Sequence, residues 1–169
     1  MNWFFLTAAY SGLSPKAPGT VGSFVALVLG IFILLFFDVQ TLFLAAILVS
    51  IVGIKEINRY EEKSGIHDDK RIVIDEVAGM WFAISIAPAV TISFSEITVF
   101  QNGFLIQSLM SFVFFRYFDI AKPSIIGRID KEAKGGIGVM GDDILAGFSA
   151  GILSAALWQI YLKIAALWI

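Results

Sequence analysis

Five apolar segments, separated by short turns or charged stretches, constrain the fold of this chain more than any other feature. A helix needs about 20 apolar residues to cross the hydrocarbon layer of a bilayer. Of the 169 residues, 58% are hydrophobic and 15% are charged, whereas soluble domains carry about a quarter charged residues. We therefore predict an all-α, polytopic helical membrane protein. The expected spans are residues 21–37, 41–54, 77–94, 104–118 and 144–167.

The start of the chain and its basic residues predict an orientation. Residues 3–9 are apolar but too short to span a bilayer, so we expect a short interfacial or re-entrant helix. No basic region precedes them, so no cleaved signal peptide is expected. The stretches 55–75 and 116–141 each hold five lysines and arginines. By the positive-inside rule both are cytoplasmic, which puts the C-terminus outside. No internal repeat is visible, and we expect one membrane-embedded domain over residues 1–169.

The glycine-rich stretch 135–147, GGIGVMGDDILAG, places two carboxylates at the mouth of the last span. Its first four glycines predict a loop that leads into a helix. Side chains of adjacent helical residues diverge, so Asp142 and Asp143 are not expected to clamp one object. One would cap the helix while the other reaches a metal ion or another carboxylate. The alternative is that Asp142 only caps the helix.

A second acidic pair, Asp75 and Glu76, is predicted to begin the third span, and Gly79 leaves space beside it. Their placement could also be a simple match to the helix dipole. His67, the single histidine, precedes them and is either a solvated loop residue or a ligand.

Two further stretches carry cations. In residues 14–23 (SPKAPGTVGS), a helix start with nearby glycine suits an anion such as phosphate, with Lys16, Thr20 and Ser23 as donors. The stretch lacks the Walker A pattern, and an ordinary helix cap is the alternative. In residues 115–123, Arg116 and Lys122 lie on one helical stripe with an acid between them. Lipid-facing cations at a membrane border are the alternative there.

Together these stretches bring five acids to one membrane border, where crowded carboxylates repel one another and a hard cation offsets the repulsion. With oxygen ligands and no cysteine, Mg²⁺ is the expected ion. The absence of cysteine, the single histidine and the lack of an Asp-x-Asp-x-Thr motif exclude three phosphatase classes. The net charge of −2 argues against a nucleic-acid partner. A metal-assisted reaction of a phosphate ester remains.

Four motifs, GLSPKAPGTVGS, HDDKRIVIDEVAGMW, FRYFDIAKP and GGIGVMGDDILAG, resemble those of the phosphatidylglycerophosphatase A family and occur in the same order. The resemblance implies an all-helical membrane enzyme of bacteria that removes the terminal phosphate of phosphatidylglycerophosphate with Mg²⁺. With the orientation given by the basic stretches, we expect it in the inner membrane with its active site facing the cytoplasm. The motif acids of that family correspond to Asp68, Asp75, Glu76, Asp119, Asp130, Asp142 and Asp143.

These considerations give a defined set of candidate site residues. The predicted metal ligands are Asp68, Asp75, Glu76, Asp142 and Asp143. The predicted catalytic acids are Glu76, Asp119, Asp142 and Asp143. The predicted phosphate-binding residues are Lys16, Gly19, Thr20, Ser23, Arg116 and Lys122. The alternatives are a phosphatidyl-group transferase, whose characteristic aspartate motif is missing, and a non-enzymatic divalent-cation carrier or assembly subunit, which would hold acids near the bilayer midplane.

Overall fold

The computed structural model describes residues 2–88, 102–123 and 125–167 of the chain, and these residues form helices and connections without any strand. The elements in order are α1 (Trp3–Leu6), η1 (Ser11–Leu13), α2 (Pro18–Phe36), α3 (Val39–Ser64), α4 (Ile74–Ile86), α5 (Phe104–Ala121), α6 (Ile125–Glu132) and α7 (Gly135–Ala165). The predicted all-α class is confirmed.

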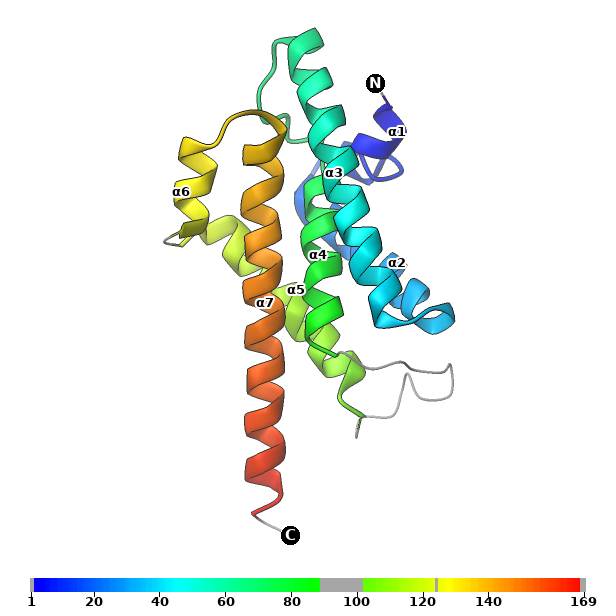
Figure 1. The fold of residues 1–169 in the computed structure, drawn as a ribbon, viewed down its shortest axis with the longest axis vertical. Coiled ribbons are helices and arrows are strands. Elements are labelled where there is room, and N and C mark those ends of the chain that lie inside the picture. Colours follow the sequence, from blue (N-terminus) through cyan, green and yellow to red (C-terminus); the bar gives the residue numbers. More distant parts are fainter. Residues whose placement is uncertain (1, 89–101, 124, 168–169) are drawn as a thin grey trace.

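Helices α2, α3, α4, α5 and α7 run alternately down and up the bundle, with the short helix α4 at its centre (Figure 1). α4 packs against α2, α3, α5 and α7, and most of its side chains are buried. The first residues of α2, α4 and α7 and the last residues of α5 lie toward the same end of the bundle. This alternation carries the polar stretches, far apart in sequence, to one region.

Among the residues that the structure describes, four helices, α2, α3, α5 and α7, are long and apolar enough to cross a membrane. The predicted third span, 77–94, corresponds in part to α4, whose 13 residues extend only about 20 Å. Residues 89–94 of that span lie outside the described residues. Within the described part, α4 serves as the buried centre of the bundle rather than as a lipid-facing span.

Two predicted loops are largely helical, which corrects the predicted boundaries. α3 continues through the charged stretch to Ser64, and α7 begins at Gly135. Charged Lys, Glu and Arg residues are good helix formers, so a helix can continue beyond its apolar part. The N-cap of α7 is Lys134, so Asp142 lies two turns inside the helix and the expectation that it caps the helix is wrong.

Glycines let α7 approach its neighbours closely. A Cβ atom at Gly147 would collide with the backbone of Gly79, and one at Gly151 would lie 2.7 Å from the carbonyl oxygen of Ala83. Gly147 and Gly151, four residues apart on α7, thus allow close packing of this helix against α4. At the start of α7, the amide of Gly136 donates to Asn58 Oδ1 at 2.7 Å, which ties α7 to the polar end of α3.

Candidate active site

The four polar stretches meet in one cavity of about 860 Å³. Each stretch contributes residues to the lining, so the predicted convergence of the four stretches is observed. The lining residues are Ala17, Pro18, Gly19, Thr20, His67, Asp68, Lys70, Ile72, Asp75, Glu76, Arg116, Asp119, Ile120, Lys122, Ala133, Gly138, Val139, Asp142 and Asp143. We refer to this cavity as the acidic pocket.

Three carboxylates form the deepest part of the acidic pocket. Asp75, Glu76 and Asp143 each offer one oxygen within 4.8 Å of the others. Asp75 and Asp143 are 9% and 3% exposed. Asp75 Oδ1 and Glu76 Oε2 are buried and have no hydrogen-bond partner within the described residues. Since buried polar atoms are normally satisfied, these oxygens fit a bound cation, and an all-oxygen set suits Mg²⁺.

Helix packing explains why these acids meet. α4 begins at Ile74, so Asp75 and Glu76 occupy its first turn, as predicted. A Cβ atom at Gly79 would lie 2.5 Å from the carbonyl oxygen of Asp143. Only a residue without a side chain allows α4 and α7 to lie this close, and the contact holds the two helices at the separation that joins their acids.

Asp142 points to a different partner from its neighbour. Its Oδ2 accepts a hydrogen bond from Lys122 Nζ at 2.7 Å, and its side chain is buried. Asp142 is not among the three acids grouped above. The expected divergence of Asp142 and Asp143 is therefore confirmed.

Arg116 brings a positive charge to the pocket wall. Its Nη1 donates to Asp119 Oδ2 and, at 3.2 Å, to Ser23 Oγ, while its Nε is buried without a partner among the described residues. Gly19 lies beside both charges, because a Cβ atom there would collide with the Glu76 carboxylate and lie 3.3 Å from Arg116 Nη2. The guanidinium thus keeps donor capacity next to the acids.

Two predicted phosphate ligands lie outside the lining of the acidic pocket. Lys16 is exposed, and its carbonyl oxygen accepts from Ser14 Oγ at 2.9 Å. Ser23 is fully buried, and its hydroxyl donates to the Gly19 carbonyl while accepting from Arg116. Ser23 thus contacts a pocket residue instead of the pocket itself. Gly19, Thr20, Arg116 and Lys122 do line it.

Asp68 and His67 lie on the exposed wall of the acidic pocket. Asp68 has a left-handed backbone, with φ of 51°, and is not part of the three-acid group. His67 Nδ1 lies 2.6 Å from Glu61 Oε1, and this contact with a carboxylate orients the imidazole ring. Asp130 falls within α6, and its side chain lies outside the described part of the chain.

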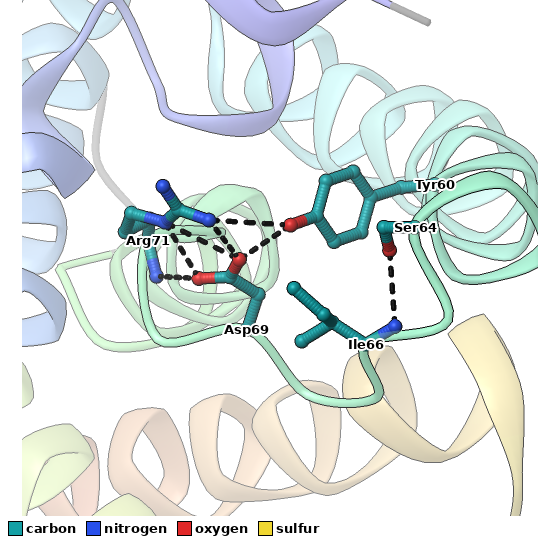
Figure 2. A network of polar contacts seen from close by, with 5 residues as sticks. All are labelled: Tyr60, Ser64, Ile66, Asp69 and Arg71. Carbon is teal, nitrogen blue, oxygen red and sulfur yellow. Dashed lines mark hydrogen bonds and ion pairs between the residues drawn. The ribbon is translucent and has the colours of Figure 1, made fainter.

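The connection 65–73, which carries this wall, is held by a polar network that sequence reasoning missed (Figure 2). Asp69 accepts hydrogen bonds from Arg71 and from the hydroxyl of Tyr60 on α3. The neighbouring guanidinium holds the pKa of Asp69 well below its usual range. Arg71 also lies over the ring of Trp3, 5.1 Å from its centroid, and Trp3 stacks on Tyr60. The signals available in the sequence were an aromatic residue near the N-terminus, Trp3, and a basic residue in the charged stretch 55–75, Arg71.

Comparisons with known proteins identify the family of this chain. The model of the family described as phosphatidylglycerophosphatase A matches residues 4–158. The chain is 35% identical to phosphatidylglycerophosphatase A of Escherichia coli over 153 residues, covering 89% of this chain and 81% of that protein. It is 32% identical to the protein of that name from Haemophilus influenzae over 147 residues, covering 87% and 82%.

A further relative carries a different name. A Bacteroides thetaiotaomicron protein, provisionally named a phosphatidylinositol-3-phosphatase, is 34% identical over 155 residues. The match covers 89% of this chain and 89% of that protein. No solved structure matches. The matched length, the identities and the order of the four motifs show that this chain belongs to the phosphatidylglycerophosphatase A family.

Proposed function

We propose that this protein is a Mg²⁺-dependent lipid phosphatase that hydrolyses phosphatidylglycerophosphate to phosphatidylglycerol and inorganic phosphate. It acts in phospholipid biosynthesis at the cytoplasmic face of the bacterial inner membrane. The single observation that carries the proposal is the group of three buried carboxylates beside Arg116, with two carboxylate oxygens that no described residue satisfies. A phosphate ester bridging a cation and a guanidinium fits this arrangement.

The residues of the acidic pocket divide the work. Asp75, Glu76 and Asp143 would hold Mg²⁺, which when bound neutralises charge on the phosphate and lowers the pKa of water. Arg116 and Lys122 bind the phosphate oxygens through charge-assisted hydrogen bonds. Asp142 keeps the Lys122 ammonium directed at the pocket.

Hydrolysis also requires proton transfer. A water oxygen forms the new bond to phosphorus, the bond from phosphorus to the glycerol oxygen breaks, and that oxygen takes up a proton from solvent water. Asp119 lines the pocket beside the three-acid group without being one of its members, so we assign it the proton of the attacking water, which it later returns to solvent. Its ion pair with Arg116 keeps this carboxylate next to the bound phosphate.

The test is replacement of Asp143 with Asn, assayed as phosphate release from detergent-dispersed phosphatidylglycerophosphate with Mg²⁺. We expect activity to fall roughly a hundredfold or more, because one of the three carboxylate ligands proposed for Mg²⁺ is replaced by an uncharged amide. Lys16→Ala is the matched control, since Lys16 is exposed and outside the pocket lining. Near wild-type turnover by a folded D143N protein would remove Asp143 from the proposed mechanism.

The name of the Bacteroides relative favours a second candidate substrate, a phosphoinositide. Both substrates are phosphate monoesters on a lipid head group, so the same pocket chemistry applies to each. Parallel assays of phosphatidylglycerophosphate and phosphatidylinositol 3-phosphate in identical micelles separate them by kcat/KM. A clear preference for the phosphoinositide would replace the proposed substrate while leaving the reaction class intact.

A further inference from the structure

An exposed apolar strip on α5 runs along the helix into the acidic pocket. The strip consists of Leu109, Val113, Tyr117 and Ile120, whose exposed fractions lie between 57% and 71%. They recur every three or four residues and therefore share one face of the helix. Ile120 also lines the pocket, so the strip is continuous with the site.

Other membrane helices expose apolar side chains as well, but the end of the α5 strip distinguishes it. Ile120, the most exposed member at 71%, is the one exposed large apolar side chain among the described pocket-lining residues. Ile72 is buried and Val139 is half-buried. Ile120 therefore marks where the polar pocket meets the apolar surface.

The neighbouring seam between α2 and α5 is closed below the pocket. Ser23 of α2 accepts a hydrogen bond from Arg116 of α5 at 3.2 Å. Close by on both helices, the rings of Phe24 and Phe112 meet edge-on with centroids 6.3 Å apart. A flexible chain leaving the pocket toward the bilayer is therefore excluded from this seam and meets the outer face of α5.

The length of the strip identifies its occupant. Ile120 lies eleven positions after Leu109, which corresponds to about 16 Å along a helix. That is close to half of the roughly 30 Å hydrocarbon layer, the depth of one leaflet. We infer that the strip binds an acyl chain of the phospholipid whose phosphate occupies the acidic pocket. The inference rests on the proposed function, and it makes α5 the path along which the lipid reaches the site.

Photolabelling tests the strip without requiring turnover. A phospholipid with a terminal phosphate monoester and a photoreactive acyl chain is irradiated with the wild-type protein in micelles, and the labelled residues are mapped. We expect labelling of residues 109–120 that is lost when the same head group without acyl chains is added as competitor. The control is the equally exposed strip Leu44, Leu48 and Ile51 on α3, where labelling should survive competition. Equal, uncompeted labelling of both strips would overturn the inference.

A second experiment uses the absence of cysteine from the chain. Val113→Cys is assayed before and after modification with a negatively charged thiol reagent, so the unmodified variant reports its own folding. After modification we expect kcat/KM for the long-chain lipid to fall about tenfold, the loss expected when roughly two methylene groups lose apolar contact. Turnover of the chain-free head group should not change.

Modified Leu48→Cys on α3 is the matched control and should keep full activity toward both substrates. Unchanged lipid turnover by modified Val113→Cys, or an equal loss for both substrates, would contradict acyl-chain binding on α5. A wild-type protein that releases phosphate from neither substrate would instead refute the proposed function, and the photolabelling result would still decide the strip.

Discussion

At the scale of single residues, the Arg116 guanidinium is positioned by Ser23, a residue that does not line the pocket. The Ser23 hydroxyl accepts from the guanidinium at 3.2 Å and donates to the Gly19 carbonyl at 2.7 Å. Ser23→Ala should leave the Arg116 group less firmly positioned. We expect KM for the lipid to rise roughly tenfold with little change in kcat, because a hydrogen bond to a charged group contributes about 1.5–3 kcal/mol.

The control for this change is Ser149→Ala. The Ser149 hydroxyl donates to a carbonyl of its own helix at 2.8 Å, as the Ser23 hydroxyl does. If both alanine variants change KM equally, the effect belongs to the local helix and not to Arg116. Steady-state kinetics at saturating Mg²⁺ distinguish these results.

Asp69 gives a prediction for the dependence of stability on pH. Its pKa is lowered in the folded protein by the Arg71 guanidinium. The stabilisation is therefore complete above the unfolded pKa of about 3.9 and is lost as pH falls toward the lower folded value. Asp69→Asn should destabilise the protein by about 1 kcal/mol at pH 7, a modest figure because Arg71 is half-exposed.

Thermal unfolding in detergent at pH 7 and pH 3 measures this effect. The difference in Tm between wild type and Asp69→Asn should be largest at pH 7 and should narrow at pH 3. A difference that is constant or grows with acidity would show that the network in Figure 2 does not stabilise the protein through ionised Asp69.

At the scale of elements, the contact between α4 and α7 sets the position of the acids. A Cβ atom at Gly147 would overlap the Gly79 backbone, which cannot move aside as a flexible side chain can. Gly147→Ala should therefore lower stability by about 1–3 kcal/mol, the usual range for overpacking, and reduce activity in parallel.

Gly141→Ala is the control on the same helix. A Cβ atom there meets only the Cγ2 methyl group of Ile129, at 3.3 Å. Alanine also favours the helix over glycine, so this variant should be at least as stable as the wild type. Similar losses in both alanine variants, measured as Tm and phosphate release, would argue against a special α4–α7 contact.

The elements also show how far sequence reasoning reached. Apolar runs located the membrane helices, and Asp75 and Glu76 marked the start of α4, because these signals are local. The glycines before Asp142 were misinterpreted as a loop, since glycine serves equally for a bend and for close packing. Gly136 packs on the Ile54 backbone, a contact that only the folded bundle reveals. The Lys122–Asp142 pair likewise joins different helices and has no sequence signal.

At the scale of the whole molecule, the polar end of α3 organises one side of the site. Tyr60 holds the connection 65–73 through Asp69, and Asn58 accepts from the first turn of α7. Glu61 contacts His67 on the pocket wall. The first half of the predicted charged loop is thus a helical extension of α3, which contacts both the connection 65–73 and the start of α7.

A bundle built around three buried carboxylates should be more stable with a divalent cation than without one. Ligand at a hundred times its Kd stabilises the state that binds it by about 2.7 kcal/mol. We expect Mg²⁺ to raise the Tm of the wild-type protein in detergent.

Without metal, Asp75→Asn should have a higher Tm than wild type, because one of three mutually repelling acids is removed. Addition of Mg²⁺ should raise the Tm of the Asp75→Asn protein only slightly. The Lys16→Ala protein should show the same Mg²⁺-dependent rise in Tm as the wild type. An Asp75→Asn protein that is less stable without metal and gains as much from Mg²⁺ as wild type does would contradict cation binding by this group.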